Sequence, residues 1–343
     1  MPLKNRLGRV CEPYKVDFIE RDVRALAEDE VLIKIKASAI CGSDLHIFKG
    51  KHPAVSLPVT IGHEMSGTVE VLGGGVTKLK RGDRVTVEPC IVCGKCDACR
   101  RGEYSFCEHI SFTYRNGDGA MADYIVIKEP YVYRLPDRLS FDEGSLIEPL
   151  SVATHAVRRA DIKLGERVAI VGAGAIGLLV TALCRLSGAA QILVSDASEQ
   201  RLAIAREFGA THTVLAPAQD IAQAALDATG GKGVDKSFEC VGREQTFVQT
   251  MLALKKNGLA TIVGIFEQPN ITIPATRFIT HEIRVQGAQG YCFDFLVALQ
   301  ASEHIDLQRL ITHTYALEQL QTALETCLDR ESGAVKVVLH PED

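Results

Sequence analysis

The sequence predicts an α/β protein with a β-rich first domain and a doubly wound, six-stranded second domain. Two observations carry this prediction: short β-type segments separated by turn residues fill the first half, and apolar strands alternate with helical segments in the second. Such alternation is typical of a parallel sheet covered on both faces. The chain has 343 residues, 46% of them hydrophobic, which is enough to fill more than one core.

The β-rich domain is expected over residues 1–150. Turn signals such as Gly73 to Gly75 separate its segments. Residues 288–343 lack a domain-sized core of their own, so we expect them to pack back on this domain. The expected strands are Val31–Ala37, Met65–Val71, Val85–Glu88 and Tyr124–Lys128.

The doubly wound domain is expected over residues 151–287. A representative helix begins near Ser198, carries apolar residues along one face and ends at Gly209, a C-cap residue. The expected strands are Val168–Val171, Gln191–Ser195, Thr211–Leu215, Lys236–Cys240, Leu259–Gly264 and Ile283–Gly287.

Composition excludes several classes of partner. The formal net charge of −5 argues against nucleic acid as a ligand. No apolar run reaches the ~18 residues that a membrane helix needs, and no leader pattern opens the chain. We therefore expect a cytoplasmic protein that binds neither nucleic acid nor membrane. Thiols stay reduced there, so the clustered members of its eleven cysteines indicate metal binding.

Four cysteines, Cys93, Cys96, Cys99 and Cys107, form a C-x2-C-x2-C-x7-C run, the most specific spacing in the chain. Thiolates so close in sequence can converge on one tetrahedral zinc ion, and four protein ligands leave no open position for chemistry. The run therefore predicts a structural zinc site that orders its own loop.

A glycine motif of the form G-x-G-x-x-G follows the first expected strand of the second domain and precedes an apolar helix. In this context Gly172 permits the tight turn, Gly174 lets a pyrophosphate approach the backbone, and Gly177 allows close helix packing. The helix N-terminus attracts the anion. The motif predicts a dinucleotide site. Further residues assigned to this site are Ile176, Val263 and Gly264.

An acidic residue, Asp196, ends the next expected strand, at about the spacing of ~20 residues where a carboxylate accepts hydrogen bonds from the adenine ribose. A ribose 2′-phosphate would bring roughly −1.5 to −2 charges against this carboxylate, so NAD is favoured. Arg201 follows in the next helix and can tolerate a phosphate, which leaves some use of NADP open.

Two segments upstream of the cysteine run also contain residue types that bind zinc. Cys41, Ser43 and His46 follow one β-type segment, and His63 and Glu64 follow another. A lone cysteine or histidine is more often a packing or surface residue than a ligand. The two segments together, in a chain with a dinucleotide motif, favour a second metal site.

These motifs, taken in order, resemble the zinc-dependent medium-chain dehydrogenase/reductase family over nearly the whole chain. The matching segments are C-G-S-D-x-H at 41–46, G-H-E at 62–64, G-D-R-V at 82–85, the four-cysteine run and G-A-G-x-I-G at 172–177. The resemblance implies a GroES-like catalytic domain, a Rossmann domain, a structural and a catalytic Zn²⁺ in each subunit, and NAD. It also implies a homo-oligomer, either a dimer or a tetramer.

The resemblance assigns Cys41 and His63 to the catalytic zinc and gives Asp44 the role of orienting His63. The alcohol dehydrogenase branch has a second cysteine ligand near the end of the first domain, where this chain has Glu148 instead. This departure resembles the polyol branch of sorbitol dehydrogenase-like enzymes, in which carboxylate and water complete the zinc shell. Whether Glu64 or Glu148 ligates directly stays open.

The implied reaction is oxidation of a secondary alcohol to a ketone. Zinc lowers the pKa of the substrate hydroxyl, and hydride passes to the nicotinamide. The proton leaves through Ser43, the cofactor ribose and His46. A carboxylate-rich site suits adjacent hydroxyls, which favours a polyol or sugar-derived substrate.

The substrate itself is less well defined. Phe112, Tyr114 and Tyr291 are candidates to line its pocket, but Gly290 stands where sorbitol dehydrogenases have an arginine, which puts sorbitol in doubt. Threonine, diol or hydroxy-acid oxidation would use the same apparatus and remain alternatives. Outside the enzymes, the alternatives are an NAD-binding regulatory protein on the same fold and a zinc-finger-like interaction module.

Overall fold

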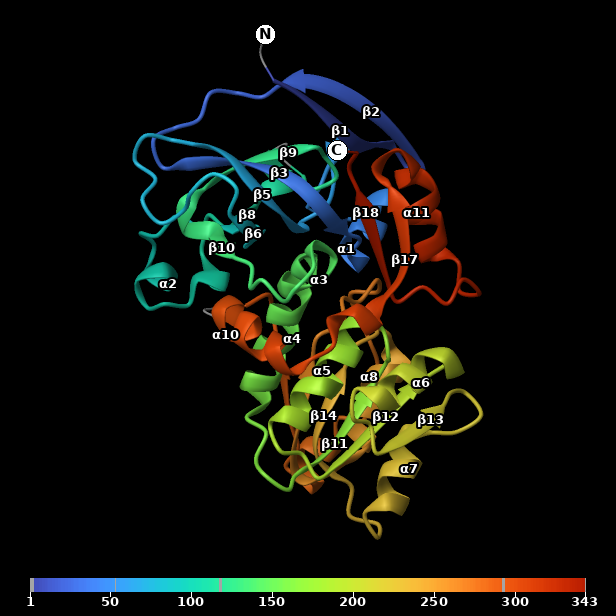
Figure 1. Ribbon diagram of the computed structural model, residues 1–343. Coiled ribbons are helices and arrows are strands. Elements are labelled where there is room, and N and C mark those ends of the chain that lie inside the picture. Colours follow the sequence, from blue (N-terminus) through green and yellow to red (C-terminus); the bar gives the residue numbers. More distant parts are fainter. Residues whose placement is uncertain (1–2, 53, 117–118, 292–293, 343) are drawn as a thin grey trace. The chain divides into compact units, whose positions relative to one another are not determined.

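The computed structural model describes residues 3–52, 54–116, 119–291 and 294–342. The chain forms two compact units (Figure 1). Unit 1 comprises Met1–Glu148 and Leu307–Asp343, and unit 2 comprises Pro149–Asp306. Within the described ranges, every helix is too short or too polar to cross a membrane.

Unit 1 is built around a seven-stranded sheet with the order β10-β6-β5-β3-β18-β17, in which β9 also pairs with β3. Val31, Ile33 and Ile35 alternate along β3 and enter one core with Met65 and Val69 of β5. A half-buried strand has this period of two. The strands are β3 Glu30–Ala39, β5 Glu64–Leu72, β6 Arg84–Val87, β9 Tyr124–Lys128, β10 Val132–Arg134, β17 Ile311–Ala316 and β18 Lys336–His340.

A three-stranded sheet, β2-β1-β4, and a two-stranded ribbon, β7-β8, complete the β structure of unit 1. The β1–β2 hairpin, dark blue in Figure 1, turns at Tyr14, whose φ is +61°. These strands are β1 Lys4–Glu12, β2 Lys15–Asp22, β4 Val59–Thr60, β7 Cys90–Ile91 and β8 Ser111–Phe112. The helices of this unit are α1 Gly42–Phe48, α2 Asp97–Arg100, α3 Phe141–Ser145 and α11 Leu320–Leu328, and α4 Ile147–Ala160 begins at its boundary.

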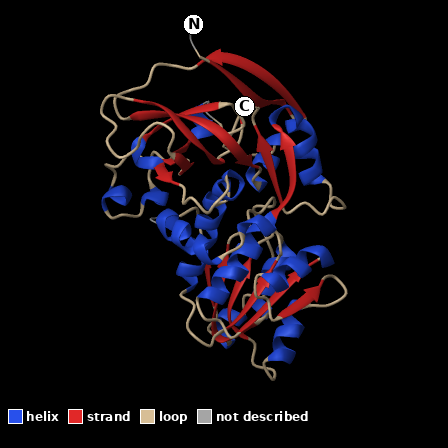
Figure 2. Cartoon of the chain, viewed as in Figure 1, coloured by secondary structure: helices blue, strands red, loops and turns tan. Residues whose placement is uncertain are grey.

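Unit 2 contains a six-stranded parallel sheet with the order β13-β12-β11-β14-β15-β16. Helices connect successive strands, as the alternation of blue and red in Figure 2 shows. The strands are β11 Arg167–Val171, β12 Gln191–Asp196, β13 His212–Leu215, β14 Val234–Glu239, β15 Leu254–Ile262 and β16 Arg284–Gly287. The helices are α5 Ala175–Leu186, α6 Glu199–Glu207, α7 Ile221–Ala228, α8 Glu244–Leu252, α9 Arg277–Thr280 and α10 Asp294–Ala301.

The predicted fold class is confirmed. The representative helix is also confirmed: the Ser198 side chain caps α6 by accepting from the Arg201 amide, and Gly209 follows the helix at φ +104°. The strand expected from Leu259 begins earlier, at Leu254.

The boundary expected after residue 287 differs from the observed division, because residues 288–306 belong to unit 2. The physical reason is the packing of α10. Phe295 and Ala298 are buried, and the Asp294 carboxylate contacts Nδ1 of His155 at 2.8 Å and the guanidinium of Arg158, both on α4. Only residues 307–343 return to the β-rich unit.

Candidate metal and cofactor sites

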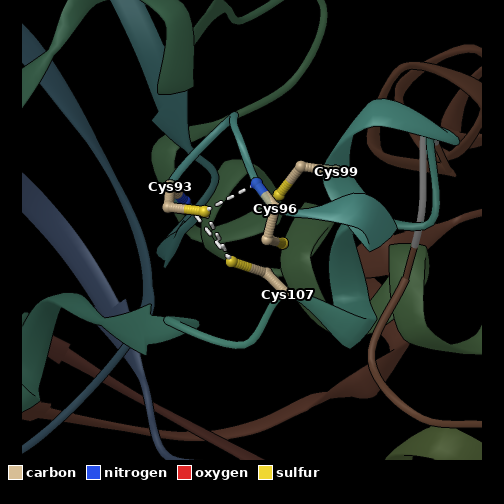
Figure 3. A group of neighbouring side chains, drawn as sticks. All are labelled: Cys93, Cys96, Cys99 and Cys107. Atoms are coloured by element: carbon tan, nitrogen blue, oxygen red, sulfur yellow. Dashed lines mark hydrogen bonds between the residues drawn. The ribbon is translucent and has the colours of Figure 1, made fainter.

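The four cysteines of the C-x2-C-x2-C-x7-C run point toward a common centre (Figure 3). Their sulfur atoms all lie within 4.8 Å of one another, and Sγ of Cys93 and Cys107 are 3.5 Å apart. Backbone amides donate to these sulfurs: Cys96 to Cys93 at 3.4 Å, and His109 to Cys107 at 3.3 Å. Such hydrogen bonds favour the thiolate form that a metal requires.

The charges of the cluster also fit a cation. Backbone amides lower the pKa of Cys96 to about 6, whereas burial and neighbouring thiols raise the pKa of Cys99 to about 12. Without a cation, neighbouring thiols cannot all ionise easily because their charges repel one another. Zn²⁺ would neutralise them, and four sulfur ligands would fill its tetrahedral shell. The cluster therefore suits a structural metal.

A buried carboxylate anchors this loop to the sheet. Glu88 accepts hydrogen bonds from the hydroxyl of Tyr104, which lies within the loop, at 3.0 Å and from that of Tyr133 on β10 at 2.7 Å. Burial raises the pKa of Glu88. Sequence reasoning missed this anchor because its three members are far apart in the chain.

The second predicted metal site is formed by strand pairing. β3 and β5 are antiparallel with Ala39 opposite Glu64, so the residues after β3 lie beside those that begin β5. Cys41, His63 and Glu64 each place a ligand atom within 4.8 Å of the others. His63 and Glu64 are buried. A thiolate, an imidazole and a carboxylate are ligands that zinc accepts, and three protein ligands leave one position open.

Asp44 holds the backbone of this site instead of the His63 ring. Its carboxylate accepts from the amide of Cys41 at 2.9 Å and from that of Gly62 at 3.1 Å. Oδ1 lies 3.9 Å from Nδ1 of His63, too far for a hydrogen bond, and this nitrogen has no partner among the described residues. The structure thus shows no Asp44–His63 hydrogen bond, and the orienting role that the resemblance gives Asp44 stays a prediction. Asp44 instead fixes both segments that carry ligands.

Glu148 is buried near the site. It does not belong to the group of Cys41, His63 and Glu64, whose ligand atoms all lie within 4.8 Å of one another. Burial raises the pKa of Glu148 to about 7. Burial lowers the pKa of His63, but Cys41, Asp44 and Glu148 outweigh it and raise that pKa well above the usual value. Three potential anions, Cys41, Asp44 and Glu148, thus act on the His63 ring, and a divalent cation at this place would interact favourably with the same groups.

The remaining predicted residues of unit 1 lie close to these ligands. Ser43 and His46 are half-buried and, being three residues apart on α1, share one face. The rings of Phe112 and Tyr114 stand 6.1 and 5.8 Å from the His63 ring, centroid to centroid. Tyr291 belongs to unit 2, where it packs against Phe295, and its role in substrate binding stays a prediction.

Sequence reasoning missed one charged residue of the site, Lys336, the first residue of β18. Its ammonium group donates to both carboxylate oxygens of Glu64 and to the carbonyl oxygen of Ile40, the latter at 3.1 Å. Burial lowers the pKa of Lys336, but Glu64 and Cys41 outweigh this effect and raise it overall. No local motif marks this lysine, because it lies 272 residues from its partner.

The glycine motif has the geometry that its sequence predicts. Gly172 has a φ of +102°, which favours glycine. A Cβ atom on Gly174 would meet no heavy atom within 4 Å, so space for a ligand adjoins the N-terminus of α5. A Cβ atom on Gly177 would stand 1.8 Å from the carbonyl oxygen of Gly172, so only glycine allows this helix to approach the turn. Ile176 is half-buried beside them.

Asp196 ends β12 and contacts the glycine turn. Its carboxylate accepts from the amides of Ala173 at 2.8 Å and Ser198 at 2.9 Å. Each carboxylate oxygen has a further lone pair, so acceptance from a ribose hydroxyl stays compatible with these bonds. Arg201 lies in the first turn of α6.

Another buried carboxylate, Glu239, joins the loops after β14 and β15. Its side chain accepts from the amides of Val241 and Gly242 and from the hydroxyl of Thr246, at 2.7–3.0 Å. Its backbone carbonyl accepts from the amides of Val263 and Gly264, both assigned to the cofactor site. Glu239 was not predicted as part of this site.

Comparison with known proteins agrees with this architecture. Residues 27–137 match the model of the alcohol dehydrogenase GroES-like domain, and residues 175–303 match that of zinc-binding dehydrogenases. A sorbitol dehydrogenase of Bacillus subtilis is 36% identical over 319 residues, covering 91% of this chain and 90% of the relative. An L-idonate 5-dehydrogenase of Vitis vinifera is 36% identical over 332 residues, covering 92% and 89%.

Among solved structures, a zinc-binding dehydrogenase of Sinorhizobium meliloti bound to NADP superposes with a TM-score of 0.93 at 30% identity, covering 99% of this chain and all of the other. The fold and the two ligand clusters define a zinc-type oxidoreductase with a nicotinamide cofactor domain. The chain belongs to the zinc-dependent medium-chain dehydrogenase/reductase family, and its relatives include polyol dehydrogenases.

Proposed function

We propose that this protein oxidises a secondary alcohol of a polyol or sugar-derived substrate to a ketone, with NAD as hydride acceptor. The observation that carries the proposal is the convergence of Cys41, His63 and Glu64, with no second cysteine in this group among the described residues, in a chain whose relatives are named for sorbitol and L-idonate. We further propose one zinc ion at this site, one at the four cysteines, and assembly as a homo-oligomer.

The residues of the site have different roles in the proposed reaction. Zinc, when bound, supplies a Lewis acid that lowers the pKa of a hydroxyl group. Ser43 and His46 share one face of α1 and can each donate and accept a proton, so they are the proposed members of a relay for the substrate proton. Phe112 and Tyr114 restrict water around His63, while the buried carboxylate of Glu148 can accept a hydrogen bond from a second substrate hydroxyl.

NAD is proposed over NADP because of Asp196. The carboxylate lies at the end of β12 and binds the glycine turn, so a 2′-phosphate nearby would meet a negative charge. Two observations favour NADP instead: a solved relative is bound to NADP, and Arg201 can tolerate a phosphate. The preference between the two cofactors is therefore to be measured. Initial rates with the two cofactors decide it: the proposal expects a higher kcat/KM with NAD, and equal or reversed values contradict it.

The test of the function combines metal removal with a substrate panel. A chelator should remove the metal at Cys41 and abolish turnover, while the four-thiolate metal is retained, because a site with a carboxylate ligand and an open position loses its metal more easily. Reduced-cofactor absorbance is then followed with polyols, diols, aldonates and threonine. Full activity after metal removal, or turnover of threonine alone, contradicts the proposal.

A further inference from the structure

Lys336 is a buried cation attached to a predicted zinc ligand. Its side chain is 4% exposed, and that of Glu64 is fully buried. The ammonium group donates two hydrogen bonds to the Glu64 carboxylate and a third to the carbonyl oxygen of Ile40. All three of its donors are therefore satisfied, and lysine is almost never buried so completely unless it is paired.

The backbone holds this cation in one place. β18 pairs with β3, with Val338 opposite Ala39, and the amide of Ile40 donates to the carbonyl oxygen of Val337 at 2.9 Å. Lys336 therefore begins its strand next to the segment that leads into Cys41. Its side chain bridges this segment to the first residue of β5, which is Glu64.

Stability alone does not explain the pair. Replacing a buried ion pair by apolar residues of similar volume is often neutral or stabilising, so a buried salt bridge is weak evidence for a stabilising role. The charge of the site offers a better reason. Cys41 and Glu64 both bind a metal as anions, and an ammonium group on Glu64 withdraws negative charge from that carboxylate.

We propose that Lys336 is a positioning residue of the zinc site, sharing the Glu64 carboxylate with the metal and keeping it an exchangeable ligand. The inference rests on the proposed zinc site and adds a regulator of its metal affinity. Without Lys336, the metal is the positive charge left beside Glu64. Glu64 then binds it more tightly and donates more charge to it, which weakens the Lewis acid.

The experiment compares release of zinc to a chromogenic chelator from the wild-type protein and from Lys336→Met and Lys336→Arg. Breaking a buried pair leaves Glu64 uncompensated in the metal-free protein, so K336M should release the Cys41-site zinc about tenfold more slowly or more. K336R keeps the charge and should behave like the wild type. Zinc at the four cysteines serves as an internal reference and should not change.

A second measurement reports on the ligands directly. With Co²⁺ in place of zinc, the visible absorption spectrum should change in K336M and not in K336R, because only loss of the cation alters how Glu64 binds. A purely structural lysine would leave both the spectrum and the release rate unchanged. Unchanged or faster release from folded K336M overturns the proposal.

The double variant K336M/E64Q keeps the test decisive if K336M does not fold, because it contains neither charge. Compared with E64Q alone, in which the ammonium group stays buried beside the metal without its carboxylate, it should release the Cys41-site zinc more slowly, because a cation that repels the metal has been removed. Equal or faster release overturns the proposal. If the wild-type protein binds zinc only at the four cysteines, the proposed function fails instead.

Discussion

Alanine substitutions at two glycines of the nucleotide motif should separate folding from cofactor binding. In Gly177→Ala the new Cβ atom would stand 1.8 Å from the carbonyl oxygen of Gly172, whereas ordinary contacts begin near 3.4 Å. In Gly174→Ala the new Cβ atom would meet nothing within 4 Å, and the φ of −70° suits any residue. The added methyl group therefore disturbs the packing of α5 at position 177, whereas at position 174 it only occupies open space.

The expected magnitudes follow from these contacts. Overpacking costs about 1–3 kcal/mol, and a backbone acceptor that cannot rotate away places Gly177→Ala near the upper end. Higher helix propensity of alanine returns about 1 kcal/mol, so a net loss of about 2 kcal/mol remains. In a unit of this size that loss lowers Tm by roughly 4–8 °C. Gly174→Ala should change stability by less than about 0.5 kcal/mol.

Cofactor affinity, measured on the folded fraction of each variant, should fall more in Gly174→Ala than in Gly177→Ala. A methyl group at Gly174 occupies the space through which a pyrophosphate approaches the backbone, so NAD should bind about tenfold more weakly, a change of about 1.4 kcal/mol. Calorimetric titration with NAD and thermal unfolding of the same samples measure both quantities. Equal losses of Tm in the two variants, or unchanged NAD affinity in Gly174→Ala, would refute the reasoning.

Two further predictions concern buried and half-buried carboxylates. Glu239→Ala should destabilise unit 2 by about 2 kcal/mol, because one buried and two partly buried hydrogen bonds lose their acceptor, whereas a loss below 1 kcal/mol in urea unfolding would contradict that role. Asp142 raises the pKa of His340 above 6.5, so the pair stabilises the fold below about pH 6.5 and loses this effect as pH rises through the raised pKa. His340→Ala should therefore cost less than about 1 kcal/mol at pH 6 and nothing at pH 9, since the pair is partly exposed. Equal costs in unfolding at both pH values would contradict this.

Elements with strong hydrophobic periodicity were predictable from sequence, and elements without it were not. All six strands of unit 2 were expected, because segments with apolar residues alternate with helical segments in this part of the chain. The start of β15 was missed because Lys255, Lys256 and Asn257 interrupt its apolar pattern. The β1–β2 hairpin was missed for a related reason: β2 is mostly exposed, so it shows no clear alternation. Burial of one face creates the signal, and strands without it escape detection.

The two candidate metal sites show the same contrast between local and long-range information. Four cysteines within one short loop define their site by spacing alone. The site of Cys41, His63 and Glu64 depends on the pairing of β3 with β5, which sequence spacing does not reveal. Family resemblance assigned Cys41 and His63 and left open whether Glu64 or Glu148 ligates directly, and it could not give the distance of 3.9 Å between Asp44 and His63.

The second site also depends on a strand from the far end of the chain. Lys336 reaches Glu64 only when β18 has paired with β3, and this pairing places Val338 opposite Ala39. Contacts of such long sequence separation require closure of a large loop, so we expect them to form after the less distant contacts of β3 and β5. The ligand cluster can therefore assemble before its buried cation arrives. If Lys336 acts as proposed, docking of β18 then supplies the charge that balances Glu64, and closure of unit 1 is coupled to the properties of the candidate metal site.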